Sequence, residues 1–135
     1  NNGPAAHTIT TPGISRKVIT VGCSDDDREV LVGGNRMVDY SGRGPTAACI
    51  CKPDLVAPGC SVVSCSSRAD KYTIKSGTSM STPIVSGAVA LLLERFPDMS
   101  NKDVKLRLRE SSVDIGLPRN QQGWGLLDVG KMLER

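Results

Sequence analysis

The segment from residue 79 to residue 95 constrains the fold of this chain more than any other part of the sequence. Its apolar residues recur at helical spacing, which predicts a long helix that begins at Ser79. Pro83 falls in the first turns, where a missing N–H costs little, and Pro97 ends the helix. The recurring apolar residues are Ile84, Val85, Ala88, Val89, Leu92 and Leu93. Such a helix is too apolar for the surface, so we expect it to be buried at the centre of the fold.

Small residues in the same helix predict close contacts with other backbone. They are Ser86, Gly87, Ala88 and Ala90. A second helix is expected from Ser100, a good N-cap with Asp103 at the third helical position, to about Ser111. A third, short helix is expected over residues 127–133.

Short β-branched or apolar runs predict strands, and runs rich in Gly, Pro, Ser and Thr predict loops. The predicted strands are residues 18–21, 30–32 and 61–64. The predicted loops are residues 1–16 and 41–60. Because strands, loops and helices alternate along a single domain's length, the predicted fold class is α/β, with a mostly parallel sheet.

Charge and hydropathy exclude two classes of partner. The formal net charge of +3 is small and the basic residues are dispersed, so no nucleic-acid partner is expected. Lys105, Arg107 and Arg109 alternate with apolar residues and are interpreted as a solvated helix face. No apolar stretch reaches the length that a membrane helix needs, so no membrane partner is expected.

The five cysteines leave at least one thiol unpaired within a single chain. Cys49 and Cys51 form a C-x-C pair, which is not the spacing of zinc sites. The three aspartates at residues 25–27 lack the spaced oxygens of a calcium loop and are interpreted as a solvated turn. We therefore expect no metal and no cofactor. Reduced thiols favour a cytoplasmic location, and secretion stays open.

The chemistry of the chain centres on Ser76-Gly77-Thr78-Ser79-Met80-Ser81-Thr82-Pro83, directly ahead of the long helix. A serine at a helix N-terminus meets unpaired N–H groups and the positive end of the helix dipole, which can stabilise an oxyanion. Gly77 permits close approach of a substrate backbone. From the residues alone, an N-cap serine in a Ser/Thr-rich cap is the alternative.

Residues 77–83 resemble the nucleophile motif of the subtilisin-like serine peptidases, G-T-S-M-(small)-(S/T)-P. Four further segments resemble family motifs in the same order. They are residues 18–22, Y-S-G-R-G-P-T at 40–46, K-P-D-L-V-A-P-G at 52–59, and G-W-G-L-L-D-V at 123–129. The resemblance implies a partial subtilisin-like fold with Ser79 as nucleophile and with Gly77 and Thr78 beside the substrate.

Asn1-Asn2-Gly3-Pro4 resembles the end of the family segment A-A-G-N-x-G-P, whose asparagine donates to the oxyanion. The resemblance implies that Asn1 is this donor, that the Ser79 N–H is the second, and that Asn2 and Gly3 lie near the specificity pocket. On the four residues alone, a plain turn asparagine is the alternative.

The family's other two catalytic segments, of D-(T/S)-G and H-G-T-H type, do not occur in these 135 residues. His7 lacks the flanking motif and is expected to be an exposed loop residue. Ile84 stands where many family members have a histidine that is not the catalytic base. We therefore expect residues 1–135 to be the C-terminal portion of a subtilisin-like catalytic domain, without the upstream Asp- and His-bearing part.

Three functional hypotheses follow. The first is part of a serine endopeptidase that hydrolyses peptide bonds together with the upstream part of the same domain and is inactive alone. The second is a non-catalytic peptide-binding lobe, and the third is a structural fragment without a function of its own. The expected partners are a peptide or protein substrate and the upstream part, and exposed sheet edges would favour self-association.

Overall fold

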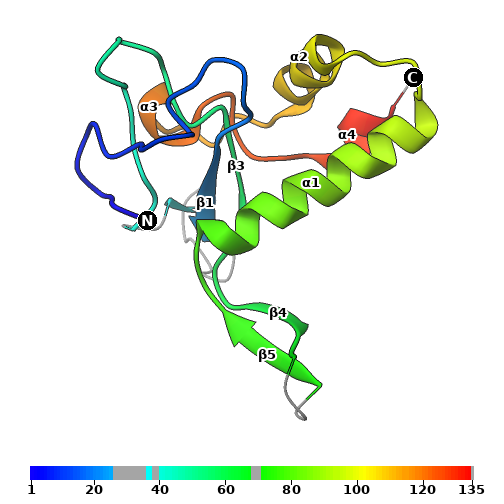
Figure 1. The fold of residues 1–135 in the computed structure, drawn as a ribbon, viewed down its shortest axis with the longest axis horizontal. Helices are drawn as coiled ribbons and strands as arrows, with labels where there is room; N and C mark the ends of the chain where they lie inside the picture. Colours follow the sequence, from blue (N-terminus) through cyan, green and yellow to red (C-terminus); the bar gives the residue numbers. More distant parts are fainter. Residues whose placement is uncertain (26–35, 38–39, 68–70, 135) are drawn as a thin grey trace.

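A small sheet packed against one long helix forms the centre of the computed structural model, which describes residues 1–25, 36–37, 40–67 and 71–134 (Figure 1). The sheet has the order β2-β1-β3. Its strands are β2 (Arg36–Met37), β1 (Val21–Asp25) and β3 (Leu55–Pro58). β1 and β3 are parallel, whereas β1 and β2 are antiparallel. The α/β class and the parallel central pairing are therefore confirmed.

The helices are α1 (Thr78–Arg95), α2 (Asn101–Ser111), α3 (Arg119–Gln122) and α4 (Val129–Leu133). α1 packs against this sheet, α4 packs against α1, and α2 packs against α4, while a separate hairpin extends away from the sheet (Figure 1). The hairpin is antiparallel and consists of β4 (Val62–Cys65) and β5 (Tyr72–Lys75).

The hydrophobic core joins β3 to one face of α1, with α2 and α4 at its far end. Its fully buried members are Leu55, Ala57, Leu92, Leu108 and Met132. Because β3 is buried along its whole apolar stretch, it carries no alternation of polar and apolar residues. This strand lies in the segment predicted as loop, and that prediction is wrong for residues 55–58.

α1 is buried on one face and exposed on the other. The buried residues are Ser81, Val85, Ala88 and Leu92, whereas Leu91 is 48% exposed and Leu93 is 37% exposed. The expectation of a buried central helix therefore holds for one face of α1 only. Nothing lies within 4 Å of a Cβ built on Gly87, so no close approach of other described residues requires this glycine, whereas Ala88 is buried in the core.

Polar contacts explain why β1 begins later than predicted. The predicted strand covered residues 18–21, but the Thr20 N–H donates to the Asp54 carboxylate and the Val18 carbonyl accepts from lysine side chains. The sheet pairing therefore starts at Val21, opposite Leu55. The strand predicted at residues 30–32 lies outside the described residues, as do Asp26 and Asp27 of the predicted turn, while Asp25 ends β1.

Three smaller differences concern element ends. β4 starts one residue later than the predicted strand, and its partner β5 was not predicted. α4 begins at Val129 rather than at residue 127, because Asp128 caps it by accepting the Lys131 N–H at 2.9 Å. Leu127 instead donates its N–H to the Val56 carbonyl at 2.9 Å, beside β3.

The N-terminus of α2 confirms the predicted cap. The Ser100 Oγ accepts the Asp103 N–H, and the Asp103 carboxylate accepts the Ser100 N–H, so both donors are satisfied. The hydrogen bond from the Ser100 hydroxyl, followed by that from its backbone N–H, lowers the pKa of the Asp103 carboxyl below its usual range.

Two adjacent leucines of α1 test how the helix is packed. We expect Leu92→Ala to lower the free energy of unfolding by about 3 kcal/mol, because it empties a fully buried site. The matched control Leu91→Ala lies on the exposed face, so its cost should stay below about 1 kcal/mol. Urea unfolding followed by circular dichroism measures both, and equal losses would contradict the one-sided burial of α1.

Candidate active site

Ser79 is the second residue of α1 and is exposed. The first N–H groups of a helix lack intrahelical partners. Here Thr78 donates to Asn1, while Met80 and Ser81 donate to the Gly77 carbonyl at 2.9 and 3.4 Å. Within the described part of the chain, the Ser79 N–H has no such acceptor. The backbone N–H and the hydroxyl of Ser79 are therefore both available at the exposed, positive end of the α1 dipole.

The Asn1 side chain is bound to the start of α1, across a sequence separation of 77 residues. Its Oδ1 accepts the Thr78 N–H at 3.0 Å and the Thr78 hydroxyl at 2.9 Å. Its Nδ2 is 3.6 Å from a Cβ built on Gly77, a position that is 3.7 Å from the Ser79 nitrogen. Because Thr78 holds the oxygen, the NH₂ group stays available as a donor beside Ser79.

Gly77 and Gly59 fix the backbone that carries Ser79. Gly77 has a φ of 150°, a conformation that side chains rarely adopt, and its N–H donates to the Gly59 carbonyl at 2.8 Å. A Cβ on Gly59 would clash with Ser81 Oγ and would lie 2.6 Å from Cys23 Sγ and 2.8 Å from the Gly77 carbonyl. The glycine after β3 is therefore required by close approach of α1 to the sheet.

A cavity of about 340 Å³ adjoins this site. Asn1, Thr78 and Thr82 lie on its α1 side, and the remaining wall comes from the segments 8–13 and 18–21 together with Gly42. Among the described residues, those that line it have no charged side chains. The predicted substrate residues Asn2, Gly3 and Gly77 are outside the lining.

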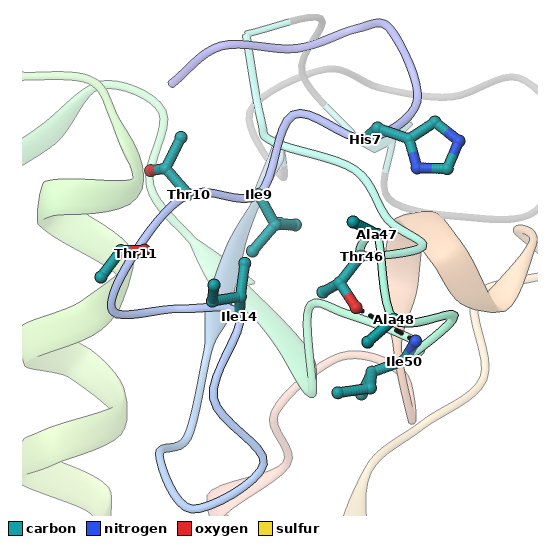
Figure 2. A pocket seen from close by; sticks show the side chains of 9 residues that line it. All are labelled: His7, Ile9, Thr10, Thr11, Ile14, Thr46, Ala47, Ala48 and Ile50. Carbon is teal, nitrogen blue, oxygen red and sulfur yellow. Dashed lines mark hydrogen bonds between the residues drawn. The ribbon is translucent and has the colours of Figure 1, made fainter.

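A larger cavity of about 740 Å³ lies behind the loop of residues 9–11, which lines both cavities. Figure 2 shows its isoleucine side chains, Ile9, Ile14 and Ile50, with His7 at one edge. His7 is exposed and does not line the cavity of Asn1 and Thr78, in agreement with its prediction as an exposed loop residue.

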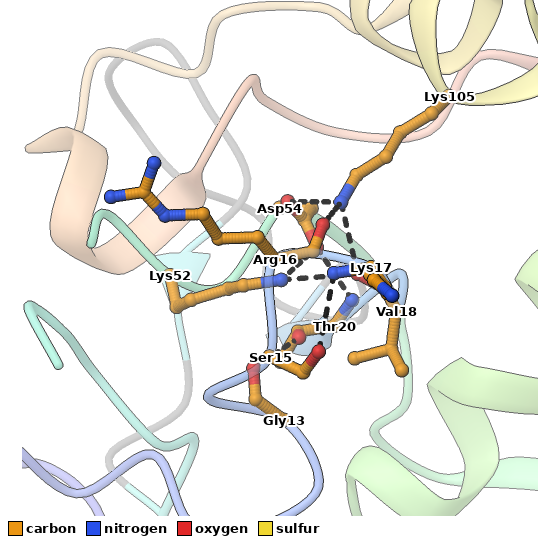
Figure 3. Close-up of polar contacts among 9 residues, drawn as sticks. All are labelled: Gly13, Ser15, Arg16, Lys17, Val18, Thr20, Lys52, Asp54 and Lys105. Atoms are coloured by element: carbon orange, nitrogen blue, oxygen red, sulfur yellow. Dashed lines mark hydrogen bonds and ion pairs between the residues drawn. The ribbon is translucent and has the colours of Figure 1, made fainter. Parts of the chain in front are cut away.

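Three charged residues, which we call the lysine clamp, bind the backbone of Val18 and Thr20, two residues that line the smaller cavity (Figure 3). They are Lys52, Asp54 and Lys105, and both lysine side chains approach the Asp54 carboxylate, at 2.6 and 3.4 Å. Both ammonium groups also donate to the Val18 carbonyl, at 3.1 and 3.0 Å. Sequence reasoning assigned the clamp no role, although a carboxylate beside a buried strand is a signal for a paired charge.

The structure thus brings Asn1, Thr78 and Ser79 together, with Gly77 beneath them, as the family resemblance implied. The Gly3 N–H donates to the Tyr40 carbonyl at 3.1 Å, and Asn2 is exposed. All five cysteines carry free thiols. Across the described ranges, no three His, Cys, Asp or Glu side chains are grouped to hold a metal ion, and no helix is long and apolar enough to span a membrane.

Solved structures with the same fold are proteases. The Clostridium perfringens CspB protease matches 95% of this chain, with a TM-score of 0.80 and 30% sequence identity, over 28% of its own chain. The S41 psychrophilic protease matches 96% of this chain, with a TM-score of 0.81 and 29% identity, over 46% of its own chain. Fervidolysin from Fervidobacterium pennivorans, a keratinolytic enzyme related to subtilisin, matches 91% of this chain, with a TM-score of 0.75 and 23% identity, over 20% of its own chain. The fold is therefore a partial subtilisin-like fold.

Sequence comparison extends this similarity to a named family. Serine protease AprX of Bacillus subtilis is 39% identical over 125 residues, which cover 83% of this chain and 28% of AprX. The sequence model described as the subtilase family matches residues 1–125. The chain belongs to the subtilase family. It spans less than a third of the length of AprX.

A pair of glycine variants tests the contact that fixes Ser79. We expect Gly59→Ala to lower the free energy of unfolding by about 2 kcal/mol or more, because its methyl group would overlap α1 and the Gly77 carbonyl. The control Gly87→Ala meets open space on a helix and should raise stability by up to about 1 kcal/mol. Urea unfolding gives both values. A neutral Gly59→Ala would show that this approach is not tight.

Proposed function

We propose that residues 1–135 supply the nucleophile and the oxyanion donors of a serine endopeptidase. Ser79 is the nucleophile, and Asn1 Nδ2 and the Ser79 N–H are the two donors. The observation that carries the proposal is the double hydrogen bond from Thr78 to Asn1 Oδ1, since it occupies the amide oxygen and leaves the NH₂ group free to donate near the start of α1. Family membership and the protease relatives support the same reaction class.

The proposed reaction proceeds by nucleophilic acyl transfer. The Ser79 Oγ forms a bond to the scissile carbonyl carbon while its proton passes to a base, and the carbonyl oxygen becomes an anion. Asn1 Nδ2 and the Ser79 N–H donate to that oxyanion. The peptide C–N bond then breaks, with the proton delivered to the leaving amine. Water hydrolyses the resulting acyl-enzyme and releases the second product.

The base and the group that orients it are proposed to come from an upstream part of the same catalytic domain. Neither family segment occurs in residues 1–135, and His7 lines a different cavity. Leu91 and Leu93 of α1 are exposed apolar side chains on either side of the buried Leu92, and packing of that part against α1 would bury them. Residues 1–135 are then the C-terminal portion of the domain.

Peptide or protein substrates are proposed to lie along the site, with one side chain in the cavity beside Asn1 and Thr78. Gly77, which precedes Thr78 and Ser79, has no side chain that would obstruct a substrate backbone, and Asn2 and Gly3 follow Asn1 in the sequence. Because the described residues that line this cavity have no charged side chains, its chemistry suits an uncharged substrate side chain.

The serine is tested in two preparations. Residues 1–135 alone should give background cleavage of casein and background fluorophosphonate labelling, because a serine hydroxyl without a base is a weak nucleophile. A polypeptide that joins these residues to the aspartate- and histidine-bearing segments should be active and labelled. Ser79→Ala should abolish both signals there.

Ser86→Ala is the matched control, since Ser86 lies on the same helix with its hydroxyl bonded to the Thr82 carbonyl. It should leave activity unchanged. Activity of the joined polypeptide that survives Ser79→Ala would refute the nucleophile. Peptide binding without any turnover would favour the non-catalytic peptide-binding lobe instead.

The amide is tested by Asn1→Asp in the joined polypeptide. The carboxylate retains an acceptor for Thr78 but removes the Nδ2 donor and places a negative charge beside the oxyanion. We expect kcat to fall by about 10²-fold to 10³-fold, the size found for loss of one oxyanion donor. Asn101→Asp, on the exposed start of α2, is the control. An unchanged kcat in Asn1→Asp would exclude Asn1 as a donor.

A further inference from the structure

We propose that Lys105 of α2 is a positioning residue for the substrate cavity, acting through the lysine clamp. The proposal rests on the proposed function, because the cavity it positions is the one beside Ser79. Lys105 touches none of the proposed reacting groups. It acts on the backbone of residues 16–20, which carries part of the cavity wall.

Both hydrogen bonds of Lys105 go to one short segment, residues 16–18. Its Nζ donates to the Arg16 carbonyl at 2.8 Å and to the Val18 carbonyl at 3.0 Å, and lies 3.4 Å from Asp54 Oδ1. The same Nζ lies 5.9 Å from the centroid of the Trp124 ring. Figure 3 shows the lysine reaching from α2 onto this segment. One side chain therefore fixes the orientations of two carbonyls, those of Arg16 and Val18, on a loop far away in sequence.

Lys52 and Asp54 complete the hold on the same segment. Asp54 Oδ2 accepts the Thr20 N–H at 2.7 Å and the Lys52 ammonium at 2.6 Å, and Asp54 N–H donates back to the Thr20 carbonyl at 2.8 Å. The Thr20 hydroxyl donates to the Gly13 carbonyl at 2.7 Å. The segment between Gly13 and Thr20 is therefore tied at both ends and in its middle.

Three residues of this hydrogen-bonded segment also line the smaller cavity. Gly13, Val18 and Thr20 line the cavity that Asn1 and Thr78 share, and each is bonded directly to the clamp or to Thr20. A shift of this segment would change the cavity's shape while leaving the Asn1–Thr78–Ser79 arrangement intact. Loss of Lys105 is thus expected to weaken substrate binding and to spare the chemical step.

Lys105 can be removed without exposing an unpaired buried charge. Asp54 keeps Lys52, which is 1% exposed, whereas removal of Lys52 would break the closer of the two ion pairs. Lys105 itself is 23% exposed, so Lys105→Met is compatible with folding. Lys102, exposed on the same helix, offers a matched control.

The experiment measures substrate binding and turnover in the full-length protein that carries these residues. On a Ser79→Ala background, we measure the Kd of a fluorescein-labelled casein peptide by anisotropy; on the wild-type background, we measure kcat and KM. Lys105→Met should raise Kd and KM about tenfold, as expected for one charge-assisted hydrogen bond, with kcat nearly unchanged. Hydrogen exchange at residues 13–20 should speed up in the same variant.

Lys102→Met should alter none of these quantities, and Lys105→Arg, which keeps a charged donor, should restore Kd and KM toward the wild-type values. A fall in kcat at constant KM would overturn the positioning role, and so would an unchanged Kd in Lys105→Met. If no turnover depends on Ser79 but Kd still depends on Lys105, the endopeptidase proposal fails while the positioning role stands.

Discussion

The hydrogen bond from the Gly77 N–H to the Gly59 carbonyl joins the end of β3 to the start of α1, and the site depends on it. It can form because Gly59 has no side chain, so that Ser81 and Cys23 approach closely. The bond holds the residue before Thr78 in a conformation that suits glycine. From that fixed point, α1 presents Ser79 outward and Thr78 toward Asn1. The same hydrogen bond therefore fixes how α1 packs on the sheet and where Ser79 lies in the site.

Local signals predicted the helices and the class of fold well. Periodicity and flanking prolines gave α1 to within one residue, and the Ser100–Asp103 pair gave the start of α2. β3 escaped prediction because prolines and a carboxylate surround a strand whose pairing partner is distant in sequence. Burial of α1 was overestimated, since an apolar composition does not say which side of the helix this chain covers. Such features depend on long-range contacts rather than on local pattern.

The candidate site divides in the same way. Ser79 and Asn1 could be named from motifs that resemble those of the subtilase family, and the family model matches the residues that carry them. The orientation of the Asn1 amide could not be predicted from motifs, because it depends on a contact across 77 residues of sequence. The lysine clamp could not be predicted either, because Lys105 contacts a segment that is 89 residues away. Asp54 was part of a segment that resembles a family motif, but only the fold shows that two lysines meet it.

The double acceptance by Asn1 Oδ1 has a consequence for the entropy of binding. An isolated asparagine side chain samples several rotamers and both amide orientations, and an anion that binds it must select one of them. Here a flip of the amide would place NH₂ against the Thr78 N–H, which can only donate, and would lose that hydrogen bond, whereas the Thr78 hydroxyl could still pair as an acceptor. The side chain is therefore ordered when the chain folds, before any ligand arrives. An anion that reaches the site meets a donor whose conformational freedom is already gone.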